Sequence, residues 1–327
     1  MGCNNLLLLY TGGTIGMQMS AAGLAPAGGF AERVQAEQQR QQLSLPTWQF
    51  AELLPPIDSA NMNQQHWLAM AAAIRQGVEQ GCDGVLLLHG TDTLAYSAAA
   101  LSFLLLNLPV PVLLTGSMLP AGAPDSDAWS NLFGAMAALK QGQAHGVQLF
   151  FNGQLLPGTR VSKLRSEAFD AFQQSARPRH GQRATQIPAE LSYQRPRQLV
   201  NIAVLPFYPG IQARQVQALL DSGVQALLLE CYGSGTGPSD DAQLLAVLQQ
   251  AHQRGVVLAA ISQCGEGQVE FGVYAAGSQL AQCGLLSGAG MTREAALGKL
   301  FTLLGAGLKQ DEVGHWFALD LCGELAP

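Results

Sequence analysis

The chain has 327 residues, a net charge of −6, and 48% hydrophobic residues. This length predicts two domains, or one large sheet with a smaller partner, and ensures a sizeable core. Only 12% of the residues are charged, about half of the roughly 25% usual in soluble domains. Few charges favour an oligomer that buries part of its exterior; a neutral surface rich in Gln and Ala is the alternative. The basic residues are scattered, so we expect no nucleic-acid partner.

Cysteine use and the first residues bear on where the protein works. The six cysteines form no C-x-x-C pair, and the chain is long enough to fold without disulfide bonds. We therefore expect reduced thiols and no structural metal. The first residues lack the charged and apolar regions of a signal peptide and lack a lipidation motif. The uncharged stretch 93–124 is interrupted by Asn107, Pro109 and Pro111, which favours a buried helix and strand over a membrane span. We therefore expect a cytoplasmic protein without membrane association.

Taken in chain order, short runs of apolar residues alternate with amphipathic stretches. Runs that are apolar on both faces are typical of strands in a sheet covered on both sides. The expected strands are 6–10, 84–88, 112–115, 147–151, 200–205, 226–229 and 256–261. The expected helices are 66–80, 94–107, 131–142, 213–222 and 240–254. This alternation predicts an α/β fold with mainly parallel strands and right-handed crossovers.

A polar segment with two prolines, Pro188 and Pro196, has no strong periodicity and predicts a linker over 186–198. It would join a larger N-terminal catalytic α/β domain, 1–185, whose mainly parallel sheet is flanked by helices, to a smaller C-terminal α/β domain, 199–327. A second stretch, 20–30, is rich in Gly, Ala and Pro. Its composition favours a mobile lid, with an ordinary surface loop as the alternative.

Polar residues that directly follow apolar runs are the first candidates for a site, because ligands of open parallel sheets bind at the carboxyl ends of the strands. The run 6–10 leads into Thr11-Gly12-Gly13-Thr14, where paired glycines permit a sharp turn that leaves Thr14 at the strand end. The segment has neither a P-loop nor a dinucleotide-binding spacing. Alone, such a turn is more often structural than catalytic.

The run 84–88 ends in His89-Gly90-Thr91-Asp92-Thr93, directly before a predicted helix. Thr and Asp are preferred helix N-caps, so capping alone explains them as well as catalysis does. Considered with the first motif, however, this segment gives a second hydroxyl at a strand end and adds a carboxylate. The pair therefore indicates a site more strongly than either segment does alone.

Other polar residues occur in similar contexts. Asp58 and Ser59 follow an expected turn at Pro55-Pro56 and are candidates to hold a substrate carboxylate or amine. Ser117 follows the run 112–115. Lys163, considered by composition alone, is an ordinary solvated charge.

Taken together, these motifs resemble those of the bacterial cytosolic, type I L-asparaginases, along essentially the whole chain. The resemblance rests on 10–17, 88–96, 115–117 and 169–172, and more loosely on 62–67. It implies that Thr14 is the nucleophile, that Thr91, Asp92 and Lys163 form a second catalytic group, and that Asp58 and Ser59 hold the substrate.

The implied reaction is hydrolysis of the side-chain amide of L-asparagine. A threonine hydroxyl needs a base, and a lysine fixed by a neighbouring threonine and aspartate can serve. Asp92 would also pair with the α-ammonium of the substrate, and Ser117 would complete the substrate-binding set. Attack would give an acyl-enzyme and ammonia, and water would then release aspartate. Backbone N–H groups of the two glycine-rich turns would stabilise the oxyanion. The resemblance implies no metal and no cofactor. It does imply a homodimer or a homotetramer.

The sequence departs from the family at two places. A lid tyrosine that hydrogen-bonds the nucleophile is usual, but the aligned residue is Leu24, which cannot relay a proton. In addition, the segment 262–264 matches a regulatory asparagine site of some members, but Glu230 nearby carries the wrong charge for a ligand carboxylate. We therefore expect no allosteric activation.

Three alternatives remain. Glutamine differs from asparagine by one methylene, worth only about 1–3 kcal/mol of discrimination, so substantial glutaminase activity is possible. The amidase subunit of a tRNA-dependent amidotransferase normally carries an extra domain before its first threonine motif, whereas ten residues precede Thr11 here. A weakened, amino-acid-binding relative is the third alternative.

Overall fold

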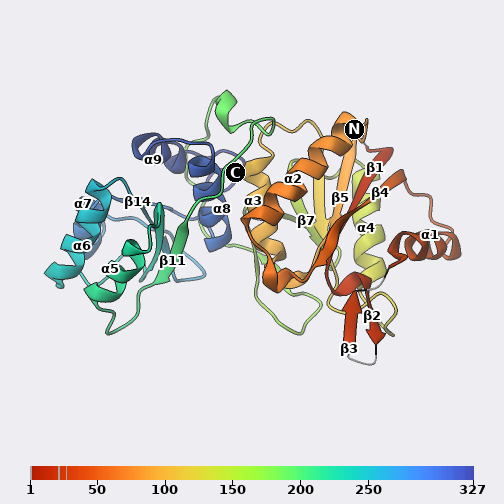
Figure 1. The fold of residues 1–327 in the computed structure, drawn as a ribbon, viewed down its shortest axis with the longest axis horizontal. Helices are drawn as coiled ribbons and strands as arrows, with labels where there is room; N and C mark the ends of the chain where they lie inside the picture. The colour runs from red at the N-terminus through yellow and green to blue at the C-terminus, as the bar shows by residue number, and fades with distance from the viewer. Residues whose placement is uncertain (1, 21–22, 27) are drawn as a thin grey trace. The chain divides into compact units, whose positions relative to one another are not determined.

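The computed structural model describes residues 2–20, 23–26 and 28–327, which form two compact units, Met1–Gln174 and Ser175–Pro327 (Figure 1). The expected boundary at residue 185 and the linker over 186–198 stay predictions. In the structure the second unit begins earlier, and the 3-10 helix η4 (Ala189–Leu191) lies within the expected linker.

The N-terminal unit is built on a six-stranded sheet of order β4-β1-β5-β6-β7-β8. Its strands are β1 (Asn5–Gly12), β4 (Thr47–Ile57), β5 (Gly84–Leu88), β6 (Val112–Thr115), β7 (Val147–Phe151) and β8 (Gln154–Pro157). All neighbours pair in parallel except β7 and β8, which are antiparallel. The residues of β5 and β6 are buried without exception, as their apolar runs predicted. The mainly parallel α/β sheet expected from the sequence is confirmed.

Helices cover both faces of this sheet (Figure 1). They are α1 (Phe30–Arg40), α2 (Gln64–Glu79), α3 (Leu94–Leu104) and α4 (Ala128–Lys140). Helices α1 and α4 pack with the even-numbered side chains of β1 and β5 in one core cluster. On the opposite face, Gly77 of α2 lies against Leu7 of β1. Both faces of the sheet are therefore occupied, and the ends of its strands are left to form a site.

The C-terminal unit has a four-stranded parallel sheet of order β11-β12-β13-β14. Its strands are β11 (Ile202–Pro206), β12 (Ala226–Cys231), β13 (Val257–Ser262) and β14 (Leu285–Ser287). Its helices are α5 (Ala213–Asp221), α6 (Ala242–Gln253), α7 (Ala275–Gln282), α8 (Arg293–Gly305) and α9 (Gln310–Ala318). The smaller α/β domain predicted from the sequence is thus confirmed.

Two segments differ from their expected structure. Pro55 and Pro56 lie inside β4, so the turn expected there is wrong. The strand tolerates them because they lie at its irregularity, between the pairs Glu52–Tyr10 and Ile57–Gly12, and because β4 is an edge strand. The stretch 20–30 contributes to an antiparallel hairpin of β2 (Met17–Ser20) and β3 (Gly23–Pro26) before α1 begins. Residues 21, 22 and 27 of this expected lid lie outside the described residues.

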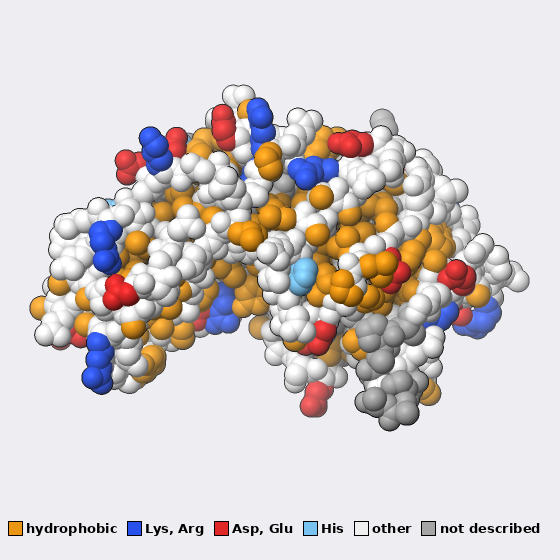
Figure 2. Space-filling model, viewed as in Figure 1, with side chains coloured by type: hydrophobic (Ala, Val, Ile, Leu, Met, Phe, Trp, Pro, Cys, Tyr) orange, Lys and Arg blue, Asp and Glu red, His pale blue; other side chains and the backbone are white. Residues whose placement is uncertain are grey.

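The surface carries few charges, as the composition indicates. On the face shown in Figure 2, blue and red side chains are scattered among uncharged ones, and Lys and Arg do not gather into one patch. In the described part of the chain, no helix has both the length and the apolar character needed to cross a membrane.

Candidate active site

The first threonine motif ends β1 in a tight turn. Gly12 and Gly13 have positive φ angles of 117° and 89°, and the 3-10 helix η1 (Thr14–Gly16) follows directly. A Cβ added to Gly13 would lie 2.4 Å from the backbone nitrogen of Gly90. Only glycine therefore lets the Thr14 turn approach the second motif this closely. Thr14 itself is partly exposed.

The second threonine motif lies at the end of the neighbouring strand, β5. Thr91–Thr93 form the 3-10 helix η3, which leads into α3. The N-cap residue of α3 is Thr93, and its side chain makes no capping hydrogen bond; its Oγ1 instead donates to the carbonyl oxygen of Ser59 at 2.8 Å. Helix capping thus does not account for the polar side chains of this segment.

Lys163 joins the second motif from a distant part of the chain. It is the last residue of β9 (Val161–Lys163), which pairs with β10 (Phe172–Gln174). Its Nζ lies 3.0 Å from Thr91 Oγ1 and 2.8 Å from Asp92 Oδ1. The Lys163 side chain is 18% exposed, whereas that of Asp92 is 63% exposed. The structure thus brings together all three members of the predicted second catalytic group.

The predicted substrate-binding residues lie at the ends of strands on either side. Asp58 caps the 3-10 helix η2 (Ser59–Asn61) after β4 and is exposed, accepting from the Ala60 N–H at 3.2 Å. Ser59 is buried against the second motif, because a Cβ on Gly90 would lie 2.5 Å from its Oγ. Strands β4, β1 and β5 are neighbours in the sheet, so their carboxyl ends meet at one edge.

Ser117 follows β6, the next strand of the sheet, and is also buried. Its Oγ donates to the carbonyl oxygen of Leu119 at 2.5 Å. The Asp127 carboxylate accepts from the N–H groups of Met118 and Leu119, which holds this loop in place. The hydroxyl hydrogen of Ser117 is therefore committed to its own loop, and its oxygen lone pairs are what it offers to a ligand.

The role of His89 was missed at the sequence level. Its ring is buried, with Nδ1 2.6 Å from the carbonyl oxygen of Gly90 and Nε2 2.8 Å from Ser97 Oγ. The Trp67 Nε1 donates to the same hydroxyl at 3.0 Å. Because a carbonyl only accepts, Nδ1 carries the hydrogen, and Ser97 donates to Nε2. Burial lowers the pKa of His89 to about 4. The neutral ring thus anchors the backbone just before Thr91, a function that a residue pattern does not reveal.

Two departures from the family pattern have structural outcomes. Leu24 lies on β3 opposite Met19 in the hairpin, so its backbone is part of an ordered strand. Glu230, whose negative charge is the reason that we expect no allosteric activation, is paired with an arginine of the same unit. Both oxygens of its carboxylate accept from Arg293, and Arg177 donates to the carbonyl oxygens of Ser262 and Cys264. These arginines come from distant segments, which a local scan of the sequence does not bring together.

Comparisons with known proteins match one family along most of the chain. The family model described as asparaginase, N-terminal, matches residues 5–197, and the glutaminase/asparaginase C-terminal domain matches residues 201–317. The chain is 38% identical to L-asparaginase 1 of Escherichia coli strain K12, across 99% of this chain and 98% of that protein. It is also 35% identical to the 60 kDa lysophospholipase of Homo sapiens, where the match covers 98% of this chain and 61% of the human protein.

A solved structure agrees over the whole length. The crystal structure of L-asparaginase I from Vibrio cholerae superimposes with a TM-score of 0.85 at 32% sequence identity, covering 99% of both chains. The shared fold therefore includes both units of the chain.

Proposed function

Because the chain belongs to the asparaginase family, we propose that it is an L-asparagine amidohydrolase working through a threonine acyl-enzyme. The observation that carries this proposal is the position of Lys163 Nζ between Thr91 Oγ1 and Asp92 Oδ1. A lysine held at hydrogen-bond distance from a hydroxyl can exchange a proton with it once a substrate is in place. An ordinary surface lysine would have no such fixed partners.

In the proposed mechanism, Thr14 Oγ1 attacks the side-chain amide carbon of asparagine. Lys163 takes part as a neutral amine, after its ammonium group has lost a proton to solvent. The amine accepts the Thr14 proton and passes a proton to the amide nitrogen, which leaves as ammonia. A water then attacks the ester, which releases aspartate and returns a proton to Thr14. The backbone N–H groups of the two turns around Gly13 and Gly90 serve as donors to the oxyanion, where one lost donor costs on the order of 10²–10³ in rate. No step requires a metal or a cofactor.

The substrate-binding set is Asp58, Ser59, Asp92 and Ser117. Asp92 is mostly exposed and lies beside the cation of Lys163, so it can reach a substrate α-ammonium without losing its partner. Asp58 supplies a second exposed carboxylate, and the buried Ser59 and Ser117 present hydroxyl oxygens. These acceptor oxygens suit the α-ammonium group of a small amino acid, which supports asparagine as the substrate.

Ammonia release from asparagine and from glutamine tests the proposal. We expect the wild type to release ammonia from asparagine with the higher kcat/KM, and Thr14→Ala and Thr91→Val to lose at least about 10²-fold in kcat. Binding of asparagine without turnover would make the chain an amino-acid-binding relative and overturn the enzyme. Equal kcat/KM for both amides would overturn the asparagine preference in favour of a mixed glutaminase.

We also propose that the enzyme is a cytoplasmic homodimer or homotetramer. The low charge content supports an assembly, and so do large exposed apolar side chains in both units, such as Leu164, Phe169, Val273 and Tyr274. The absence of disulfides among the six cysteines is compatible with a reducing compartment.

A further inference from the structure

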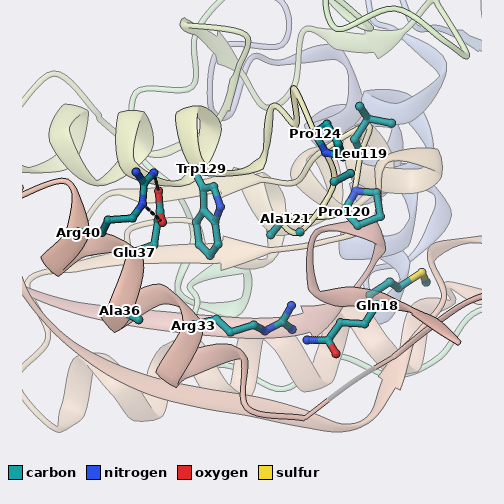
Figure 3. Close-up of a pocket in the computed structure, with 13 residues that line it drawn as sticks. Gln18, Arg33, Ala36, Glu37, Arg40, Leu119, Pro120, Ala121, Pro124 and Trp129 are labelled. Atoms are coloured by element: carbon teal, nitrogen blue, oxygen red, sulfur yellow. Dashed lines mark hydrogen bonds and ion pairs between the residues drawn. The ribbon is translucent and has the colours of Figure 1, made fainter.

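A cavity of about 890 Å³ lies in the N-terminal unit, apart from the strand-end residues of the proposed active site. Its walls are helix α1, the start of β2 and the loop that follows β6 (Figure 3). This volume falls within the roughly 300–1,000 Å³ typical of small-molecule sites. None of Thr14, Ser59, Thr91 and Lys163 lines it.

The cavity walls are largely apolar. One side is the indole of Trp129, and the other is a loop of small and apolar residues that includes Leu119, Pro120 and Pro124 (Figure 3). Trp129 is held by stacking on Phe30 at 6.2 Å between ring centroids. A rigid aromatic wall facing prolines suits a planar apolar body, because such groups bury area at little cost in conformational entropy.

One cation at the cavity has spare hydrogen-bonding capacity. The Arg33 Nη2 donates to the carbonyl oxygen of Gly16 at 2.8 Å, while its buried Nε has no hydrogen-bond partner among the described residues. The second arginine of the walls, Arg40, is committed to Glu37 through its Nε at 2.7 Å. Arg33 extends along the cavity toward Gln18 in Figure 3. Its guanidinium is therefore the group available for an anion.

We propose that this cavity binds a small aromatic carboxylate, with its ring against Trp129 and its carboxylate on the Arg33 guanidinium. A planar guanidinium recognises a carboxylate through two parallel hydrogen bonds, which favours this anion over an uncharged ligand. The other charges on the walls, Arg40 and Glu37, neutralise each other. The cavity thus combines an apolar surface with one guanidinium that contacts a backbone carbonyl and the Phe30 ring and forms no ion pair with a described carboxylate.

Occupation of the cavity should reach the Thr14 turn, because the walls are bonded to it directly. Arg33 donates to the carbonyl oxygen of Gly16, and the Ala121 N–H donates to the carbonyl oxygen of Ile15 at 3.3 Å. Both acceptors belong to η1, whose first residue is Thr14. A carboxylate that draws Arg33 away from Gly16 would change the support of this turn, so the ligand would modulate turnover. This second part of the inference rests on the proposed function, whereas ligand binding does not.

Binding is tested by titration calorimetry with 2-naphthoate and, as its neutral counterpart, 2-naphthylmethanol. We expect the wild type to bind the carboxylate at least about tenfold more tightly than the alcohol, and Arg33→Gln to remove that difference. Ala36→Trp adds an indole to the cavity wall on α1 and should weaken both ligands at least tenfold. Gln35→Trp, on the same helix but outside the cavity lining, is the matched control and should bind as the wild type does.

Several results would overturn the site. These are equal affinity for the two probes, unchanged affinity in Ala36→Trp, or no binding of 2-naphthoate at millimolar concentration. Loss of binding in Thr14→Ala would assign the probe to the active site instead.

If 2-naphthoate binds in the cavity, a saturating concentration of it should change kcat/KM for asparagine by about fivefold or more in the wild type and in Gln35→Trp. An unchanged kcat/KM with the probe bound would overturn the coupling, and absent turnover in every protein would overturn the proposed function while leaving the binding result intact.

Discussion

The Lys163 amine contacts two of the other proposed catalytic side chains, the hydroxyl of Thr91 and the carboxylate of Asp92. Removing the amine should therefore remove proton transfer without disturbing the fold. We predict that Lys163→Met lowers kcat by about 10²–10⁴-fold and leaves the unfolding midpoint nearly unchanged. Lys140→Met is the matched control, since Lys140 is exposed at the end of α4 and its amine donates to Ser44. A Lys163→Met enzyme with wild-type kcat would contradict the proposed base.

His89 predicts a pH dependence of stability. Burial lowers its pKa to about 4, against an ordinary 6.5, so the unfolded chain takes up a proton at a higher pH than the folded chain. The stability that depends on the neutral ring is therefore complete above about pH 6.5 and is lost as the pH falls toward 4. It amounts to about 3 kcal/mol at about 1.4 kcal/mol per pKa unit.

Denaturant unfolding of the wild type and of His89→Gln between pH 4.5 and 7.5 measures this contribution. We expect a shallower dependence of the unfolding free energy on pH in the variant, whatever its absolute stability. Equal slopes in the two proteins would show that the ring is not a buried neutral group.

At the scale of elements, the turns at the ends of β1 and β5 position the residues of the candidate site. Gly13 has φ of 89° and approaches Gly90 too closely for a side chain. We predict that Gly13→Ala displaces the Thr14 turn and lowers kcat/KM by about 10²-fold, the cost of a misplacement near 1 Å. Gly272→Ala is the control, because nothing lies within 4 Å of its added Cβ and its φ is not in the left-handed region. Equal kcat/KM values for both variants and the wild type would contradict the role of this turn.

Much of the parallel core could be predicted from the sequence. Strands β5, β6 and β7 begin and end at the expected residues, because buried parallel strands are continuous apolar runs. Strand β4 could not be predicted this way, because as an edge strand it is half exposed and carries Pro55 and Pro56. Helix α1 was missed because only Phe30 and Val34 are buried and its other residues are polar or alanine.

The same reasoning applies to the candidate site. The threonine motifs were visible because they follow apolar runs, whereas Lys163 was singled out only by resemblance. A three-residue strand such as β9 has no periodicity to detect, and Lys163 and Thr91 lie 72 residues apart in the sequence. His89 and Arg33 act through backbone carbonyls, and a sequence pattern does not encode such partners.

At the scale of the whole molecule, the charge content and exposed apolar side chains predict self-association. Sedimentation velocity at micromolar concentration should give a dimer or a tetramer. Tyr274→Asp, which adds a charge at a side chain that is 60% exposed, should weaken the assembly if that surface is buried in it. A wild-type protein that sediments as a stable monomer with full activity would contradict the proposed oligomer.

The central claim is that Thr14 carries the acyl group during hydrolysis of asparagine. Rapid acid quenching of the wild type during turnover, followed by mass mapping of its peptides, tests this claim directly. We predict one aspartyl group on the peptide that contains Thr14 and none in Thr14→Ala. An aspartyl group on the peptide that contains Thr91, or turnover by Thr14→Ala at the wild-type rate, would contradict it.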